Sequence, residues 1–104
     1  MKRAVRWSRD AIDDFKHQIA YIAEENPVAA RRVADRIEAA AAALGALATG
    51  KPGRVHGTYE RAITRLPFMI AYAITAAADG EAIAILRVIH GARDWPDETW
   101  PSRK

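Results

Sequence analysis

The alternation of apolar and polar residues predicts a short first strand followed by an amphipathic helix. In residues 3–7, Val5 and Trp7 alternate with arginines, as expected of a strand with one buried face. Ser8 follows at a position where its side chain can cap the first turn of a helix. Beyond it, apolar residues recur every three or four positions, which is the spacing of one helix face; they are Ile12, Phe15, Ile19 and Ile22.

A second amphipathic helix begins almost immediately after the first. Asn26 and Pro27 form a helix-start signal, with Asn as the cap and Pro at the first helical position. Arg31 and Asp35 on its polar face have the spacing of an i,i+4 ion pair. Because almost no loop separates the helices, we expect an antiparallel helical hairpin. The apolar stripe of the second helix comprises Ala30, Val33, Ile37, Ala40, Leu44 and Leu47.

Three strands follow a loop over residues 49–57, which is rich in glycine, proline and basic residues. We expect strands over 59–65, 68–75 and 81–90, with Asp79 and Gly80 in the last turn. Each connection is too short for a crossover, so these strands should form an antiparallel meander. The first strand should pair at one edge or near the centre of the same sheet. Residues 97–104 should form a tail.

The predicted fold class is α+β, with residues 1–104 as one domain. An N-terminal strand and an antiparallel helical hairpin should pack on one face of a small antiparallel sheet. Both sides of the last two strands are largely apolar, however, and one hairpin covers only one side of a sheet. Either the sheet coils around its own core, or a partner completes the second face. The alanine run 39–43 indicates strong helix propensity, and would also allow close approach to the second helix.

Composition excludes several classes of site. The chain of 104 residues has no cysteine, so it has neither disulfides nor thiolate metal sites. Its three histidines lack ligand spacing, and the glycine-rich loop lacks the Lys-Ser/Thr ending of a P-loop. We therefore expect no metal and no cofactor. No signal core or membrane span is evident, so we expect a soluble, cytoplasmic protein with no membrane partner.

The net charge of +3 is modest, and twelve of the sixteen basic residues are arginine. Arginine suits carboxylates and phosphates equally, so charge does not decide between an acidic protein and RNA as the partner.

The end of the last strand is the most distinctive stretch. His90, Arg93 and Trp95 follow one another around the flexible Gly91, an arrangement that suits an anion, a base or a partner's backbone. The alternative is a central strand followed by a segment that only covers the core. Arg87 lies inside the apolar strand, where an unpaired guanidinium would be costly. It should face solvent, a partner or an acidic side chain.

Three segments together give the chain a strong resemblance to the RelE/ParE toxin superfamily. They are Gly-Arg-Val-His-Gly-Thr-Tyr-Glu at 53–60, Pro-Phe-Met-Ile-Ala-Tyr at 67–72, and Leu-Arg-Val-Ile-His-Gly-Ala-Arg-Asp-Trp-Pro at 86–96. The resemblance spans nearly the whole chain. It implies the toxin of a bacterial type II toxin–antitoxin pair, held in a hetero-oligomer with a cognate antitoxin.

Two activities divide this superfamily: RelE-like members cut messenger RNA in the ribosome, and ParE-like members poison DNA gyrase. RNA cleavage requires a base, an acid and cations at the scissile phosphate. Alignment through the two tyrosines shared with RelE-type enzymes puts Glu60, Ala62 and Met69 where the strand cations would be. Only Arg93 matches the nuclease pattern. The resemblance therefore favours gyrase inhibition, which needs no catalytic residues.

Two alternatives stay open. A second nuclease pattern in the superfamily uses Glu, Arg and His, for which Glu60, Arg87 or Arg93, and His90 are the candidates, with the ribosome and mRNA as partners. A non-toxic module that only binds an antitoxin is the other. For gyrase, the expected contact residues are Arg87, His90, Arg93 and Trp95, with Trp100 as a weaker candidate. The antitoxin is expected to contact the helical hairpin and the sheet, through Ile12, Phe15, Ile19, Arg31, Arg32, Arg36, Met69 and Tyr72.

Overall fold

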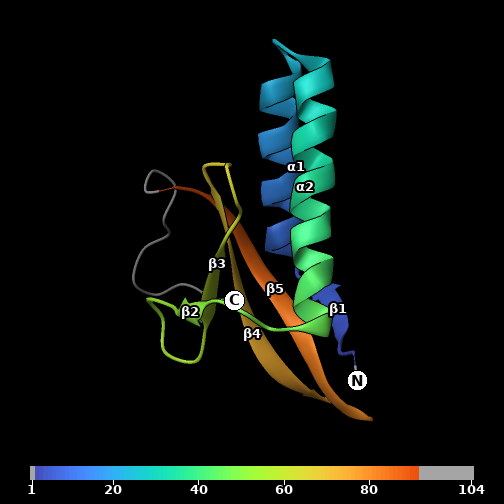
Figure 1. Ribbon diagram of the computed structural model, residues 1–104, viewed down its shortest axis with the longest axis vertical. Coiled ribbons are helices and arrows are strands. Elements are labelled where there is room, and N and C mark those ends of the chain that lie inside the picture. The colour runs from blue at the N-terminus through green and yellow to red at the C-terminus, as the bar shows by residue number, and fades with distance from the viewer. Residues whose placement is uncertain (1, 92–104) are drawn as a thin grey trace.

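The computed structural model describes residues 2–91, which form a helical hairpin packed on a five-stranded sheet. In Figure 1 the two helices stand side by side against the sheet, and the turn that joins them projects beyond the strand ends. The predicted α+β architecture is confirmed. In chain order the elements are β1 (Ala4–Trp7), α1 (Arg9–Ala23), α2 (Pro27–Ala46), β2 (Lys51–Pro52), β3 (Tyr59–Ala62), β4 (Phe68–Ala77) and β5 (Gly80–His90).

The sheet has the strand order β1-β5-β4-β3-β2. Strands β3, β4 and β5 form the predicted antiparallel meander. β1 lies at one edge, but it runs parallel to β5, so the expectation of a wholly antiparallel sheet was wrong in this respect. A parallel pair needs a long connection, and the helical hairpin and the strands after it supply one.

The strands differ from the sequence prediction in one additional strand and in several bounds, with β4 extending to Ala77 and β5 beginning at Gly80. Within the expected loop, Lys51 and Pro52 form β2, a two-residue strand that pairs with Glu60 and Tyr59. Pro52 lacks an amide hydrogen and is tolerated because β2 is an edge strand. β3 ends at Ala62, three residues earlier than expected, because residues 63–67 make the turn into β4.

The helix starts follow the predicted capping chemistry. The Ser8 hydroxyl accepts from the backbone N–H of Ala11 at 3.0 Å, and Asn26 Oδ1 accepts from that of Ala29 at the same distance. Pro27 is the first residue of α2. These caps satisfy backbone donors that the helix itself cannot. The position and direction of each helix are therefore set locally.

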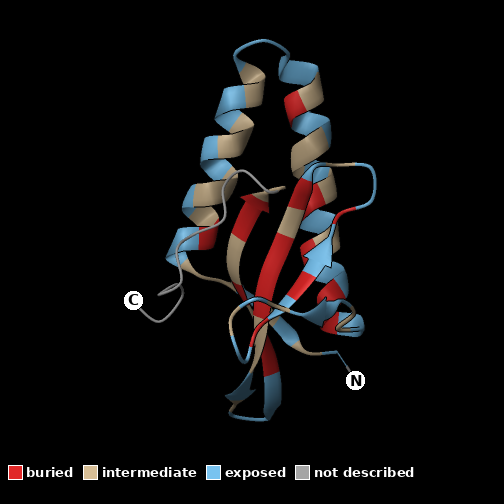
Figure 2. Cartoon of the chain, turned by 90° about the vertical axis from the view of Figure 1, so that its left-hand side faces the viewer, coloured by how far each residue is buried: buried red, intermediate tan, exposed pale blue. Residues whose placement is uncertain are grey.

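The main core lies between α2 and the inner face of β4 and β5. Ile37 and Leu44 of α2 are at most 1% exposed, and Phe15, Ile19 and Ile22 of α1 pack more loosely against the same core. Figure 2 shows the buried residues concentrated along the central strands, while the outer end of the helical hairpin is mostly exposed or half-buried. The fully buried strand residues of this core include Ile70, Tyr72, Ile83, Ile85 and Val88.

The second face of the sheet has a smaller cluster of its own. Ala71 and Ile89 are each 1% exposed, with Val55 and Leu86 packed against them. Val55 belongs to the segment between β2 and β3. The chain itself thus covers part of the second face of the sheet, for which the sequence predicted either coiling of the sheet or a partner.

Gly45 allows the last turn of α2 to contact the N-terminal strand segment. The Arg3 amide donates to the Gly45 carbonyl at 2.7 Å, and a Cβ added at Gly45 would lie 2.6 Å from the Arg3 carbonyl oxygen. That distance is shorter than any ordinary contact, and the atom it meets is backbone. The position therefore requires glycine for space.

We expect Gly45→Ala to lower the free energy of unfolding by about 2 kcal/mol, because overpacking outweighs the better helix propensity of alanine. Ala42→Gly on the exposed side of α2 is the control, with a loss of about 1 kcal/mol from propensity alone. Denaturant unfolding measures both. Stabilisation by Gly45→Ala would show that the segment before β1 moves freely away from α2.

Candidate functional site

Beyond β1, the outer edge of β5 is closed by polar groups at the start of α1. β1 pairs with β5 only as far as Ile85. From there the Ser8 amide donates to the Ile85 carbonyl at 2.9 Å, and the Ser8 hydroxyl donates to the Leu86 carbonyl at 3.0 Å. Two residues further, the Val88 amide donates to Asp14 Oδ2 at 3.0 Å. The strand edge is thus satisfied by side chains in place of another strand.

Asp14 also binds the side chain of Arg87. Arg87 Nε lies 2.7 Å from Asp14 Oδ2, and its Nη2 lies 2.9 Å from Oδ1, a bidentate ion pair. The two side chains are 23% and 17% exposed. Of the three surroundings expected for Arg87, the structure contains the acidic side chain. Its guanidinium therefore serves first to join β5 to α1.

His90, at the end of β5, has a polar atom that the fold does not use. Its ring meets Phe68 edge-on, with ring centroids 5.3 Å apart. The imidazole Nδ1 is buried and has no hydrogen-bond partner among residues 2–91. Gly91 then turns the chain with a φ of 46°, a conformation that favours glycine. Arg93, Trp95 and Trp100, the other expected target contacts, lie outside the described residues.

Glu60 is held beneath the segment that joins β2 to β3. It is only 7% exposed, and its Oε2 accepts from the Arg54 amide at 2.9 Å. Within the same segment the Gly53 amide donates to the Thr58 carbonyl at 2.8 Å. The carboxylate thus fixes the fold of this loop. This structural role is sufficient to explain why the acidic side chain of Glu60 is buried.

The strand register places Glu60 and His90 on opposite faces of the sheet. Glu60 pairs with Ala71, on the face of the small second cluster. His90 pairs with Phe68, whose side chain belongs to the main core. Paired residues on neighbouring strands point to the same side. Glu60 and His90 therefore do not lie at one site, although both belong to the alternative nuclease set of Glu60, Arg87 or Arg93, and His90.

The positions aligned with nuclease cations do lie together. Ala62 pairs with Met69, and Glu60 is two residues from Ala62 on the same strand, so all three share one face. The three positions that the alignment matches to the nuclease cations therefore lie on one surface of the sheet. None of the three residues is a cation, and the carboxylate of Glu60 adds negative charge instead. These three positions therefore do not supply the positive charge that a scissile phosphate needs.

The residues expected to contact the antitoxin do not form one surface. Phe15 and Ile19 pack against the core, and the Trp7 and Phe15 rings meet edge-on at 5.5 Å. Ile12 is half-buried on α1. Met69 is half-buried on the opposite face of the sheet.

Tyr72 was a wrong choice for a surface contact. It is 1% exposed, and its hydroxyl donates to the Thr49 carbonyl at 2.7 Å. Its ring stacks on that of Tyr59, with centroids 5.5 Å apart. The polar tip of the side chain thus fixes the chain after α2, while the ring belongs to the core.

The three arginines of α2 have different surroundings. Arg31 and Arg32 are exposed, and Arg31 Nε lies 3.8 Å from Asp35 Oδ1, which confirms the predicted i,i+4 pair. Arg36 donates from Nη2 to the Thr64 carbonyl. It therefore lies at the junction of α2 and the turn after β3.

Sequence reasoning missed a groove at this junction, between α2 and β3. The hollow has a volume of about 230 Å³. Leu47 lines it and is 69% exposed, although the helical pattern predicted a core residue; it follows the end of α2 in an extended conformation. The only sequence signal was the alanine run 39–43. The groove is lined by Arg36, Ala39, Ala40, Ala43, Leu44, Leu47, Thr49, Arg61, Ala62, Ile63 and Thr64.

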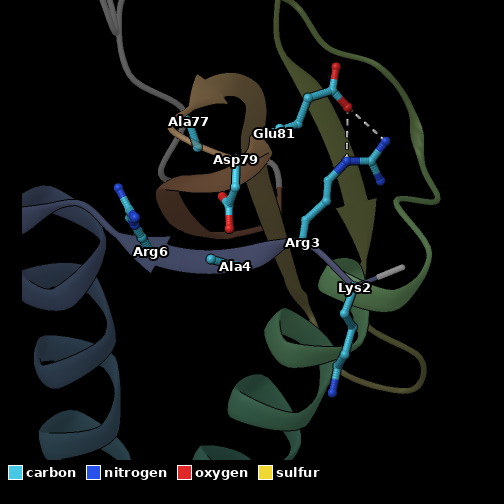
Figure 3. A pocket seen from close by; sticks show the side chains of 8 residues that line it. Lys2, Arg3, Ala4, Arg6, Ala77, Asp79 and Glu81 are labelled. Carbon is cyan, nitrogen blue, oxygen red and sulfur yellow. Dashed lines mark hydrogen bonds and ion pairs between the residues drawn. The ribbon is translucent and has the colours of Figure 1, made fainter.

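A larger hollow of about 750 Å³ lies where β1 meets the β4–β5 turn. Figure 3 shows Arg3 pointing to Glu81, with Nη2 2.9 Å from Oε1, while Lys2 and Arg6 point away from that pair. Asp79 contributes a second carboxylate to the lining. The cations do not converge, so the hollow does not have the charge pattern of an anion site.

Within residues 2–91 there is no cluster of three or more His, Asp or Glu side chains arranged to hold a metal ion. No helix in the same range is long and apolar enough to cross a membrane.

Comparison with known proteins defines the class of this fold and site. A family model described as "ParE toxin of type II toxin-antitoxin system, parDE" matches residues 5–95. The provisionally named toxin Y4kP of Sinorhizobium fredii is 34% identical over 96 residues, which cover 91% of this chain and 95% of that protein. The chain belongs to the ParE family, the toxins of type II toxin–antitoxin systems.

Solved structures support the same fold. The structure titled "Chromosomal ParDE TA system from P. aeruginosa" superposes with a TM-score of 0.77 at 22% identity, covering 86% of this chain and 97% of that one. The toxin–antitoxin complex RelBE2 from Mycobacterium tuberculosis gives a TM-score of 0.54 at 25% identity, covering 88% of this chain and 94% of that one. The fold is therefore shared across the RelE/ParE superfamily.

We expect Asp14→Ala to lower the free energy of unfolding by about 2–4 kcal/mol, because it removes the carboxylate that pairs with Arg87 and accepts from the Val88 amide. Asp13→Ala is the matched control: Asp13 is 64% exposed and its Oδ1 lies 3.7 Å from Arg9 Nε, a contact worth at most about 0.5 kcal/mol. Adding Arg87→Leu to Asp14→Ala should recover part of the loss. Equal effects of the two aspartate variants in denaturant unfolding would contradict this role.

Tyr72 should make stability depend on alkaline pH. Burial, with a smaller contribution from Tyr59, raises the pKa of Tyr72 above its ordinary value of 10.0. Its contribution is therefore fully present below the unfolded-state pKa and is lost as pH rises through the folded-state pKa. We expect Tyr72→Phe to flatten the decline in unfolding free energy above pH about 10. Denaturant unfolding across that range tests this, and identical slopes for the two proteins would count against it.

Proposed function

We propose that this toxin inhibits DNA gyrase by protein–protein contact and that a cognate antitoxin neutralises it. The observation that carries the proposal is that the three positions aligned with the nuclease cations, Glu60, Ala62 and Met69, share one face of the sheet and hold no cation. Losing preorganised cations at a scissile phosphate costs several kcal/mol of transition-state stabilisation each, about 3 for a typical donor. Inhibition by contact requires no such charge, and the match to the ParE family model agrees with it.

The proposed target surface is the end of β5. His90 supplies a buried, unpartnered imidazole nitrogen there, next to the turn at Gly91. Arg93 and Trp95 follow in the sequence, and Trp and Arg are residue types that dominate binding hot spots. Arg87 contributes through its pair with Asp14, which holds the end of β5 in place. Because gyrase acts on the chromosome, the toxin would work in the cytoplasm.

The proposed partner in the resting state is an antitoxin. Two similar structures are titled as a ParDE system and a RelBE2 toxin–antitoxin complex. By analogy, this toxin forms a hetero-oligomer with the product of a short neighbouring gene. The ribosome-dependent nuclease remains the alternative activity, but its Glu, Arg and His set is split between two faces of the sheet.

Two assays on the purified chain separate these activities. We expect inhibition of gyrase supercoiling of relaxed plasmid, and no cleavage of messenger RNA in a ribosome-containing translation mixture. Messenger cleavage without an effect on gyrase would replace the proposal with the nuclease. Normal growth of cells expressing the chain, with neither activity in vitro, would indicate a module that only binds antitoxin.

Within the gyrase assay, His90→Ala should weaken inhibition at least about tenfold if the end of β5 contacts the target. His17→Ala is the matched control, since His17 is an exposed histidine of α1 and is not part of the proposed target surface. Thermal unfolding of both variants shows whether loss of the Phe68 contact alone unfolds the protein. Full inhibition by a folded His90→Ala protein would remove this residue from the target surface.

A further inference from the structure

The turn between β3 and β4 holds an arginine in a backbone conformation that favours glycine. Arg65 has a φ of 66°, and among residues 2–91 it is the one non-glycine residue with a positive φ. The Leu66 amide donates to the Ile63 carbonyl at 3.1 Å, so Arg65 is the third residue of a four-residue turn. A turn with a positive φ at this position usually carries glycine or asparagine there. A larger residue is strained, because its Cβ lies too close to the following carbonyl oxygen.

The surroundings of the turn fix its shape. Ile63 is 6% exposed, and Leu66 packs against the main core. The Ile63 amide donates to the Phe68 carbonyl at 3.0 Å, and Arg36 of α2 donates from Nη2 to the Thr64 carbonyl. The turn therefore cannot relax to another conformation without breaking contacts on both of its sides. Backbone strain that the surrounding structure imposes in this way is concentrated at functional sites.

The strained turn lies beside the end of β5. Phe68, the first residue of β4, pairs with His90, and a Cβ added at Gly91 would lie 3.5 Å from the Pro67 carbonyl oxygen. Figure 1 shows the connection from β3 to β4 at the same end of the sheet as the end of β5. The side chain of Arg65 is exposed. It therefore extends the surface that the proposed function assigns to the target.

The charge around the turn is positive. Within the described chain, neither Arg65 nor Arg36 forms an ion pair with a carboxylate. Residues 63–67 include no acidic residue. Arg32, which is exposed one helical turn before Arg36, likewise has no carboxylate partner among residues 2–91. These guanidinium groups are available to an acidic partner, for which the complementary charge would favour association.

A protein surface fits this turn better than DNA does. A DNA-binding surface typically makes about six or more phosphate contacts, and the turn with its neighbours on α2 offers fewer cations than that. Apolar groups are accessible next to the cations, since Leu66 is half-buried and Pro67 is exposed. Arginine combined with apolar contact area is typical of protein–protein interfaces.

We propose that Arg65 is a target-contact residue, whose guanidinium binds an acidic surface of gyrase beside the end of β5. The chain keeps an arginine at a position that favours glycine because the side chain makes this contact. The proposal rests on the proposed function, since gyrase is the partner that it names. It adds the β3–β4 turn to a target surface that otherwise consists of the end of β5 and the residues after it.

The test separates the charge of Arg65 from its backbone strain. Arg65→Gly and Arg65→Ala both remove the guanidinium, but only glycine relieves the strained φ. We expect both variants to weaken inhibition of gyrase supercoiling at least about tenfold. The midpoint of thermal unfolding should rise by about 3 °C for Arg65→Gly and stay near that of the wild type for Arg65→Ala. A loss of inhibition combined with a gain in stability is a result that a purely structural arginine would not give.

Two further variants serve as controls. Arg65→Lys keeps the positive charge at the strained position, and it should inhibit gyrase more strongly than Arg65→Ala does. Arg9→Ala removes the same charge from a position outside the turn, where the side chain is 87% exposed and lies 3.7 Å from Asp13. We expect it to change inhibition less than about threefold, because a single distant surface charge is screened by salt.

The outcomes distinguish this contact from the proposed function as a whole. If the wild-type toxin does not inhibit gyrase, both are overturned. If it does, but Arg65→Ala inhibits equally well, or Arg65→Gly unfolds at no higher temperature than Arg65→Ala, only the assignment of Arg65 fails. Calorimetry with the antitoxin and binding to plasmid DNA without gyrase complete the test. A loss of affinity for either of these in Arg65→Ala, with inhibition of gyrase retained, would assign the turn to that partner and overturn the proposal.

Discussion

The carboxylate of Asp14 is the contact through which the helical hairpin holds the central strand. It accepts one hydrogen bond from the backbone of Val88 and two from Arg87, so a single side chain replaces a missing strand neighbour and neutralises a partly buried guanidinium. Burying either charge alone would be costly. Because β5 is also the strand that ends in His90, the geometry of the proposed target surface depends on this pairing.

The two edges of the sheet are treated differently. Beyond β1, the edge of β5 is closed by Ser8 and Asp14, both belonging to the start of α1. Beyond β2, the described residues leave the edge of β3 at Ala62 open beside a helix face made of alanines. An exposed edge is a liability for an isolated protein, since it invites pairing with other chains. An edge that a partner covers is no such liability. The contrast between the two edges therefore agrees with the proposed complex with an antitoxin.

Glu60 illustrates how one fold can serve two activities. Its position, together with Ala62 and Met69, forms a coherent surface on the sheet, which is where RNA-cleaving relatives are expected to carry cations. In this chain the carboxylate is used to fix the loop after β2, through the Arg54 amide. The strand geometry is shared with the superfamily, while these three positions hold no cation in this chain, which illustrates that function depends on sites and not on the fold itself.

Apart from the two-residue β2, the sequence alone determined the elements and their order. Caps at Ser8 and Asn26, apolar spacing in the helices and the short connections between the last three strands act over a few residues, so they can be identified without a structure. Whole-chain resemblance also indicated the toxin class. The functional surfaces are harder to predict from the sequence, because they depend on contacts between residues far apart in the chain. Whether Arg87 is free or paired depends on Asp14, 73 residues away.

The dependence on contacts between distant residues also explains why some of the expected contact residues are not on the surface. Tyr72 was expected to contact the antitoxin but lies in the core, because it alternates onto the same face of β4 as Phe68 and Ile70 and its ring stacks on that of Tyr59. The groove at Ala43 and Ala62 is formed by two elements that share no sequence signal. Local chemistry therefore determined what the segments of this protein are, and only tertiary packing decided which backbone groups and charges remain available to a partner.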